Sequence, residues 1–182
     1  TKLGKERRQA AKLIERSIES ELEQHNMART RMVVDFQVAP EIGPSGSDVI
    51  EFLLAANQGE DPKPLTKIAS GGELSRIMLA IKTVLAERDS ISTYVFDEVD
   101  TGIGGSTADL VGEKIAATAK SHQVFCITHL PQIASRGDLH YLVEKTSKDG
   151  RTQSLIRPLP ADERVEEIAR MLGGARVTAK TK

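Results

Sequence analysis

Aromatic residues are scarce in this chain of 182 residues, which contains no Trp, two Tyr and four Phe. Binding of single-stranded nucleic acid by base stacking needs several exposed rings, so the composition argues against that mode. Positive charge is not in excess either, because 25 Lys and Arg residues stand against 26 Asp and Glu residues. With a formal net charge of −1, no overall field drives the chain onto nucleic acid or an anionic membrane, although local patches could still do so.

Cysteine and long apolar runs are also nearly absent. Cys126 is the single cysteine, which excludes an intrachain disulfide and a cysteine-based zinc site. It lies in the apolar run 124–127, where we expect a buried core thiol rather than a reactive one. No apolar stretch approaches the roughly 18 residues of a membrane-spanning helix, and no signal peptide opens the sequence. These absences predict a soluble intracellular protein, most simply a cytoplasmic one.

Residues 1–31 are rich in charge and contain no proline. A narrow apolar stripe runs along them at helical spacing, formed by Ala10, Ile14, Ile18 and Leu22. Such a stripe on an otherwise charged helix is more typical of a coiled coil than of a globular core. The stripe is too short for a self-sufficient coiled coil, so we expect a helix that is the end of a longer one.

The region 32–174 has the alternating strands and helices of one α/β lobe, and the apolar content of 39% suffices for its core. We expect strands over 32–39 and 48–56, joined by a loop rich in proline and glycine. A further loop is expected over 57–64. The small, basic tail 175–182 is expected to be disordered.

The middle of the lobe is predicted as a helix over 72–88, a strand over 92–97, a helix over 106–120 and a strand over 123–128. This strand–helix–strand order predicts a parallel crossover unit. The expected buried faces are Leu74, Ile77, Met78, Ile81, Val84 and Leu85 on the first helix, and Leu110, Val111, Ile115 and Ala119 on the second. A short helix at 131–135, a hairpin of 138–145 with 152–158 and a helix over 162–172 complete the expected lobe.

Two adjacent carboxylates, Asp97 and Glu98, follow the apolar run 94–96. A buried parallel strand ends at the sheet edge where ligands bind in open α/β folds. A carboxylate at that edge can hold Mg²⁺, and the neighbouring Glu can polarise a water for attack on a γ-phosphate. Acidic residues also commonly end strands without any such role, so this pattern is a weak signal by itself.

The segment Ser70, Gly71, Gly72 and Glu73 precedes the first of these helices. Ser-x-x-Glu before an apolar helix is a capping box, and nothing functional need follow from it. The same geometry can bind an anion, because two glycines let a phosphate approach free amides at the positive end of the helix dipole. A capping box does not require two glycines, which favours the functional interpretation.

His129 follows the strand 123–128, and Asp100 lies in the turn after Glu98. A histidine at a strand end is usually just a surface residue. Here the strand comes next after the acidic pair, so His129 could reach the γ-phosphate side of the same pocket. Asp100 adds a further polar group at that edge.

In their order and separation these segments resemble the ATP-binding-cassette ATPases. The resemblance makes Ser70, Gly71, Gly72 and Glu73 the signature loop, Asp97 and Glu98 the end of the Walker B strand, Asp100 part of the D-loop, and His129 the switch histidine. The string 67–76 and the charged helical arm are similar to the SMC-like branch rather than to transporters. The strings 96–105 and 128–134 resemble the RecN family, the bacterial SMC-like proteins of double-strand-break repair, and the ending 170–174 is similar too. The resemblance is most specific over 65–136.

The resemblance implies an α/β fold, the C-terminal lobe of an ABC/SMC-type ATPase head, with residues 1–31 as a coiled-coil remnant. An N-terminal lobe of the same protein would complete the head, since the phosphate loop G-x-x-x-x-G-K-[ST] is absent from this sequence. The implied cofactors are ATP and Mg²⁺, with Asp97 as the metal ligand and Glu98 as the catalytic base. The isolated chain is expected to be inactive.

In the family picture, two heads engage around two ATP molecules as a homodimer. His129 would contact the γ-phosphate of its own head. Ser70, Gly71 and Gly72 would cap the γ-phosphate of the opposing head, and Asp100 would communicate across the dimer. ATP binding would close the heads and hydrolysis would release them, and the implied output is DNA tethering in repair and recombination at the nucleoid in the cytoplasm.

Two alternatives stay open from the sequence. One is an SMC-type chromosome-organising head, and the other is a non-catalytic dimerisation or DNA-bridging module that keeps the shapes of the motifs. DNA contact has the least support. Its candidate residues are Lys2, Lys5, Arg7, Arg8 and Lys12, with Arg29, Arg31 and the basic tail 180–182, all of which could equally be solvated charges.

Overall fold

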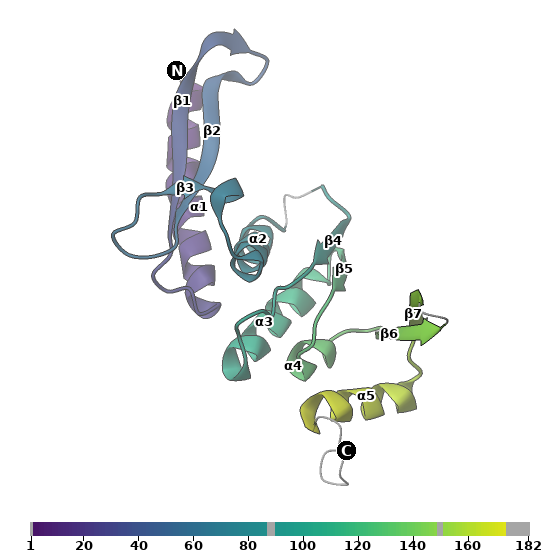
Figure 1. Ribbon diagram of the computed structural model, residues 1–182. Coiled ribbons are helices and arrows are strands. Elements are labelled where there is room, and N and C mark those ends of the chain that lie inside the picture. Colours follow the sequence, from purple (N-terminus) through teal and green to yellow (C-terminus); the bar gives the residue numbers. More distant parts are fainter. Residues whose placement is uncertain (1, 87–89, 149–150, 174–182) are drawn as a thin grey trace.

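The computed structural model describes residues 2–86, 90–148 and 151–173 (Figure 1). The expected tail 175–182, the helix end at Arg88 and the hairpin turn at 149–150 lie outside the described residues. The elements are α1 Lys2–Gln24, β1 Arg31–Gly43, β2 Gly46–Ala55, β3 Lys63–Pro64, the 3₁₀ turn η1 Leu65–Lys67, α2 Gly71–Leu85, β4 Thr93–Phe96, α3 Gly105–Thr118, β5 Gln123–Cys126, α4 Pro131–Ala134, β6 Tyr141–Lys148, β7 Arg151–Pro158 and α5 Ala161–Gly173. No helix of the described part is long and apolar enough to cross a membrane.

Helix α1 ends at Gln24, earlier than the expected boundary at 31, because the chain turns there. Asn26 has a φ of 60°, a left-handed conformation that Asn tolerates better than most residues. The second half of the apolar stripe packs within this chain and not against a coiled-coil partner. Ile18 and Leu22 are fully buried in a core shared with α2 and the first sheet. Leu13, in the middle of the helix, is by contrast 66% exposed.

Strands β1 and β2 form a long antiparallel hairpin beside α1, with the short β3 on the far side of β2 (Figure 1). The expected loop between the strands is wrong for most of its length, since β1 continues through Pro40 to Gly43 and β2 begins at Gly46. A register shift between Val38 and Gly43 lets the strand pass Pro40, which has no N–H to donate.

Two glutamates of α1 satisfy the free edge of β1. Glu15 Oε1 accepts a hydrogen bond from the Val34 N–H, and Glu19 Oε1 accepts one from the Met32 N–H, both at 2.9 Å. Four residues of helix rise about 6 Å, and two residues of strand rise about 7 Å, so the spacings match. The helix is therefore fixed against the sheet by directional bonds as well as by apolar packing.

Strands β4 and β5 pair in parallel, with α3 crossing between them, as predicted. One face of this two-stranded sheet is buried with α3, through Tyr94, Phe96 and Val111. The opposite face is apolar and open. Phe125 is 49% exposed there and Ile127 is 57% exposed.

The predicted buried faces of the two central helices are partly wrong. Helix α2 lies between the two cores (Figure 1), so Leu79 and Ala80 are fully buried while Leu74 and Met78 lie at the surface of a groove. On α3, Leu110 is 37% exposed. Ala119 is exposed as well, and Ala108 and Thr118 are buried in their place. A single apolar stripe predicts one packing partner, whereas α2 has partners on two sides.

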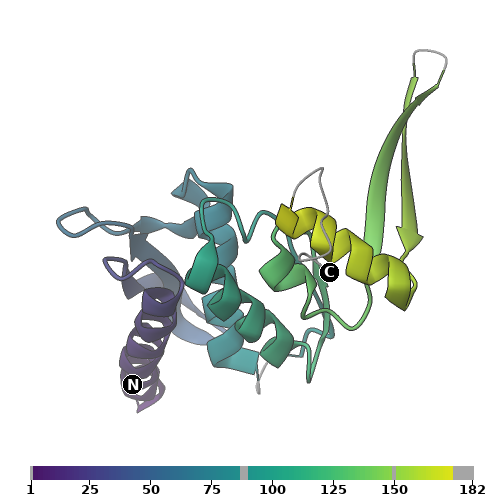
Figure 2. The ribbon, with the colours of Figure 1, turned by 90° about the horizontal axis from the view of Figure 1, so that it is seen from below.

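The last elements form a separate edge of the molecule. Strands β6 and β7 pair as the predicted antiparallel hairpin, which projects from the body in Figure 2 with α5 near its base. Helix α5 packs against α4. Its Arg164 donates hydrogen bonds to carbonyl oxygens of Ser135, Gly137 and Asp138, so it fixes the loop after α4.

Candidate functional site

The loop before α2 forms the helix cap that the sequence predicts. Ser70 is the N-cap residue, and its Oγ accepts a hydrogen bond from the Glu73 N–H at 3.3 Å. The Leu74 N–H donates to the Ser70 carbonyl at 3.0 Å and closes the first turn. The return bond from the Glu73 carboxylate to the Ser70 N–H is not formed among the described residues, so the capping box is half complete.

Gly71 and Gly72 pack directly against the turn that follows β4. A Cβ atom on Gly72 would lie 2.9 Å from the Thr101 Cβ, closer than such atoms approach, and 3.1 Å from the Glu98 carbonyl oxygen, which is also tight. A Cβ on Gly71 would collide with the Glu98 carboxylate. The two glycines therefore make room for this chain's own turn, a reason for them that the sequence pattern does not contain.

Asp97 and Glu98 leave the end of β4 as predicted, and both are exposed. The Asp97 carbonyl accepts a hydrogen bond from the Ser75 hydroxyl, which ties the strand end to α2. Glu98 has a φ of 57°, and a non-glycine residue in this left-handed region carries a cost of about 1–3 kcal/mol. Strain of this kind gathers at functional sites, and here it lays the Glu98 carboxylate against Gly71.

The donor set at this edge fits a hydrated magnesium ion held by a single carboxylate. No group of three or more His, Cys, Asp and Glu side chains in the described ranges is arranged to hold a metal. Mg²⁺ keeps several waters and is usually bound by one or two carboxylates plus substrate phosphates. The exposed Asp97 carboxylate has no hydrogen bond or ion pair with any described residue, so its oxygens are available to such an ion.

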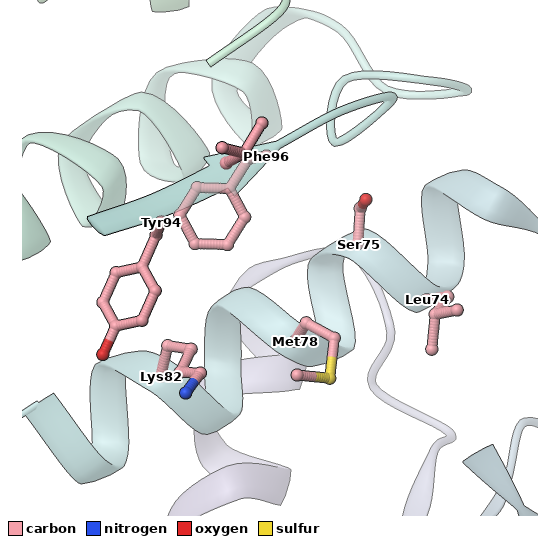
Figure 3. A pocket seen from close by; sticks show the side chains of 7 residues that line it. Leu74, Ser75, Met78, Lys82, Tyr94 and Phe96 are labelled. Carbon is pink, nitrogen blue, oxygen red and sulfur yellow. The ribbon is translucent and has the colours of Figure 1, made fainter. Parts of the chain in front are cut away.

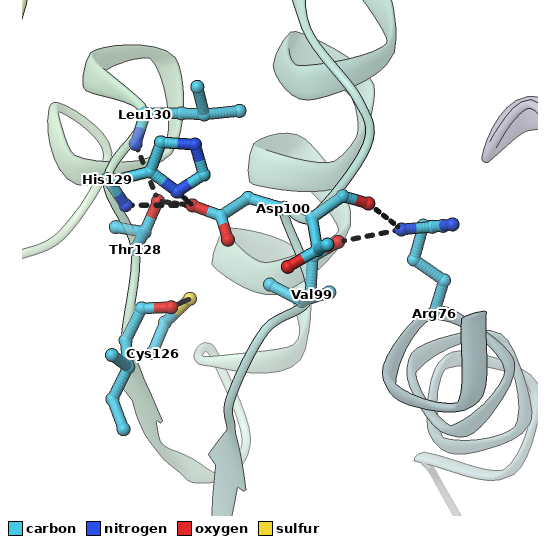
Figure 4. Close-up of polar contacts among 9 residues, drawn as sticks. Arg76, Val99, Asp100, Cys126, Thr128, His129 and Leu130 are labelled. Carbon is cyan, nitrogen blue, oxygen red and sulfur yellow. Dashed lines mark hydrogen bonds and ion pairs between the residues drawn. The ribbon is translucent and has the colours of Figure 1, made fainter. Parts of the chain in front are cut away.

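Asp100 joins the turn after β4 to the segment after β5 (Figure 4). Its side chain is 3% exposed. Its Oδ2 accepts hydrogen bonds from the Thr128 hydroxyl at 2.6 Å and from the His129 N–H at 2.8 Å, and it lies 2.9 Å from His129 Nδ1. These contacts engage the buried Asp100 carboxylate within its own lobe, and its expected role across a dimer stays a prediction.

His129 itself points outward. Its side chain is 70% exposed, and the contact of Nδ1 with Asp100 leaves Nε2 facing solvent. A carboxylate beside Nδ1 favours the ring form in which that nitrogen carries the proton. The structure thus connects His129, Asp100, Glu98 and the 70–73 loop through direct contacts and the short turn 98–101.

Arg76 is a buried cation that sequence reasoning did not single out. Its guanidinium donates to the Thr101 carbonyl at 2.7 Å and to the Val99 carbonyl at 3.4 Å (Figure 4). Burial lowers the pKa of the Arg76 guanidinium, and the charge of Glu73 opposes that shift. A charged residue beside Ile77 on the apolar side of a predicted helix is the signal that could have found it.

Cys126 lies at the end of β5, partly buried and beside the Asp100 turn. Burial, followed by the charges of Asp100 and Asp97, raises the pKa of its thiol to about 12. The thiol is therefore protonated at neutral pH and is a poor nucleophile. This agrees with the expected unreactive cysteine, although the side chain is less deeply placed than predicted.

A shallow groove runs between α2 and β4, on the side away from α3 (Figure 3). The helix contributes Leu74, Ser75, Met78 and Lys82, and the strand contributes residues 94–96. The groove is mainly apolar and adjoins the open face of the β4–β5 sheet. The groove is too open to enclose a small molecule. Its apolar lining is typical of a surface against which another element packs.

Comparison with solved structures identifies the class of fold. The chain matches a Smc head domain with a coiled coil and joint from Pyrococcus yayanosii, with a TM-score of 0.55 and 17% identity over 85% of this chain and 28% of that one. It also covers 96% of a chain from a structure of SMC ATPases, with a TM-score of 0.50 and 18% identity over 92% of this chain. The fold is therefore that of a lobe of an SMC-type ATPase head.

Comparison with curated proteins is more specific, although no protein-family model matches the chain. DNA repair protein RecN of Xylella fastidiosa is 56% identical over 135 residues, 74% of this chain and 24% of the relative. RecN of Halalkalibacterium halodurans is 42% identical over 97% of this chain and 32% of the relative. This chain belongs to the RecN family, and it spans about a quarter to a third of the length of the relatives it matches.

Proposed function

We propose that this chain is the C-terminal lobe of an ATPase head in a RecN-type DNA repair protein. The observation that carries the proposal is the single surface at the carboxyl edge of β4 and β5. It joins the glycines of the α2 cap to the turn 98–101, and it joins that turn to His129. The RecN relatives are named as DNA repair proteins, and the solved relatives of this fold include SMC ATPases.

In this proposal each residue has a role that its position permits. Bound Mg²⁺, with ATP, would neutralise charge on the transferred phosphate. Asp97 would hold the hydrated ion, since its carboxylate is exposed and otherwise unengaged. Glu98 would orient and deprotonate the attacking water, and His129 would present Nε2 to the γ-phosphate.

The second head of a homodimer would receive the 70–73 loop. Ser70, Gly71 and Gly72 stand at the N-terminus of a helix of fifteen residues, where free amides and the helix dipole attract a phosphate. These residues would cap the ATP of the opposing head. Gly71 is exposed for such an approach, whereas Gly72 is buried against the chain's own turn.

The N-terminal lobe of the same protein would cover the open face of the β4–β5 sheet. Val95 is 66% exposed on that face, with Phe125 and Ile127 beside it. A contiguous apolar surface of this kind favours association. The missing phosphate loop would then meet Asp97 and Glu98 at the edge of a completed sheet.

DNA would be the macromolecular partner, at the nucleoid in the cytoplasm. The structure narrows the candidate contacts, because Arg7 and Arg8 pair with Asp48, and Lys12 pairs with Glu15. Lys5, Arg29 and Arg31 are exposed, and none of them has an ion pair among the described residues. These three residues are the better candidates for phosphate contacts.

The test is ATP hydrolysis by this chain alone and after mixing with the N-terminal lobe, with and without Mg²⁺. We expect no turnover by the chain alone and Mg²⁺-dependent turnover by the mixture. No turnover in the mixture, when the two pieces are shown to associate, would overturn the proposal in favour of a non-catalytic dimerisation or DNA-bridging module.

A further inference from the structure

Arg76 occupies the point where the helix of the 70–73 loop meets the turn 98–101. It lies six residues into α2, and its residue exposure is 7%. A buried guanidinium without a carboxylate in direct contact is costly to desolvate, so its hydrogen bonds to carbonyl groups must hold it. Its two acceptors are the carbonyls on either side of Asp100, those of Val99 and Thr101.

Asp100 is held from both directions by these contacts. Arg76 fixes the backbone before and after it, and Val99 is fully buried beneath the same turn. The Asp100 carboxylate then holds the Thr128 hydroxyl and both the main chain and the ring of His129. Figure 4 shows the resulting line of contacts, which runs from α2 through the turn to the histidine.

Gly72 packs against the turn 98–101, but the position of that turn depends on the hydrogen bonds from Arg76. Gly72 lies one helical turn before Arg76 and touches Thr101 and the Glu98 carbonyl. It supplies close contact but no hydrogen bond to that backbone. Arg76 supplies the directional bonds, and a shift of the turn would move Asp100 relative to Thr128 and His129.

We propose that Arg76 is a positioning residue that sets the orientation and proton position of His129 through the backbone of residues 99–101 and the Asp100 carboxylate. An effect of Arg76 on ATP hydrolysis rests on the proposed function, whereas its effect on the His129 ring does not. The same contacts connect the helix of the 70–73 loop, which would face the ATP of the opposing head, to His129, which would face the ATP of its own head.

The first test reads the His129 ring directly. The chain has four histidines, so ¹⁵N-histidine labelling with two-bond ¹H–¹⁵N spectra at pH 8 resolves each ring, and the variant His129→Gln assigns the signal. We expect His129 to carry its proton on Nδ1 in the parent chain. In Arg76→Lys and Arg76→Met we expect a shift toward the Nε2–H form that an unconstrained imidazole prefers.

The matched control is Arg7→Lys, which changes another partly buried arginine, one that pairs with Asp48 far from the turn. It should leave the His129 spectrum unchanged. Arg76→Met removes the contacts without leaving a buried charge, so it covers the case in which Arg76→Lys does not fold. An unchanged His129 ring in a folded Arg76 variant, an equal change in Arg7→Lys, or a chain that folds with neither Arg76 variant would each overturn the proposal.

The second test uses the full-length protein. Arg76→Met should lower kcat for ATP by about tenfold, the lower end of the loss seen when an outer-shell partner that orients a metal ligand is removed, with little change in KM. Arg76→Met should add nothing to the loss caused by His129→Gln, whereas additive losses would count against a shared path. If the parent protein does not hydrolyse ATP, the proposed function fails, and the ring measurement still decides the role of Arg76.

Discussion

Gly71 and Gly72 are adjacent, but Gly72 packs mainly against backbone atoms and Gly71 packs against a flexible side chain. The Cβ of a residue at 72 would press on a carbonyl oxygen and on the Cβ of Thr101, which cannot easily move. The Cβ of a residue at 71 would meet only the far end of the Glu98 side chain. Substitutions at these two positions can therefore separate an effect on stability from an effect on the catalytic residues.

We expect Gly72→Ala to lower the free energy of unfolding by about 1–3 kcal/mol, as overpacking does elsewhere. Gly71→Ala should leave stability nearly unchanged, because the flexible Glu98 carboxylate can swing away. Urea denaturation followed by circular dichroism measures both. Equal stabilities for the two variants would show that the turn 98–101 yields to an added methyl group.

Glu98 combines an exposed carboxylate with a strained backbone. In the complete protein we expect Glu98→Gln to retain ATP binding and to lower kcat by at least about 100-fold, since general base catalysis contributes roughly that much. Nucleotide-binding and single-turnover assays separate the two effects. Normal turnover in this variant would remove Glu98 from the role of base.

At the scale of elements, the bonds between α1 and β1 connect stability to pH. Burial of Glu15 would raise the pKa of its carboxyl group, but hydrogen bonds from Lys12 and the Val34 N–H, with the charges of Lys12 and Arg16, outweigh it and lower the pKa. A folded-state pKa below the unfolded value of about 4.3 stabilises the fold above that pH. This stabilisation is lost as the pH falls through the folded-state pKa.

We therefore expect the urea midpoint of the parent chain to fall more steeply between pH 5 and pH 3 than that of Glu15→Gln. The glutamine keeps an oxygen for the Val34 N–H but has no proton to take up over that range. The matched control is Glu6→Gln, whose partner Lys2 is 93% exposed, and which should keep the steep dependence. Parallel curves for the parent and Glu15→Gln would contradict this account.

The sequence predicts the central elements well and their surroundings less well. The strand–helix–strand unit follows from a local pattern, and its parallel pairing and the position of Asp97, Glu98 and His129 are confirmed. The buried side of α2 was only half predicted, because one helix serves two cores. The contacts of Asp100 and Arg76 span more than twenty residues of sequence, and a periodic pattern carries no information on such pairings.

At the scale of the whole molecule, the open apolar face of the β4–β5 sheet and the groove beside α2 indicate that this lobe packs against another one. We expect Phe125→Lys to leave the fold of this chain intact, because the side chain is 49% exposed, and to weaken its association with the N-terminal lobe. Ile42→Lys is the matched control, since Ile42 is 85% exposed on the β1–β2 hairpin. Analytical ultracentrifugation of the mixed lobes measures both, and equal binding by the two variants would move the interface elsewhere.

The pairing of Glu15 and Glu19 with β1 limits how this part of the chain can change in length. One residue inserted between Glu19 and Met32 can be absorbed by the turn, but one inserted between Glu15 and Glu19 rotates one carboxylate about 100° away from the strand. Insertions before Glu15 disturb neither bond. These two bonds therefore place no limit on the length of the helix ahead of Glu15, while they fix the spacing of the two glutamates.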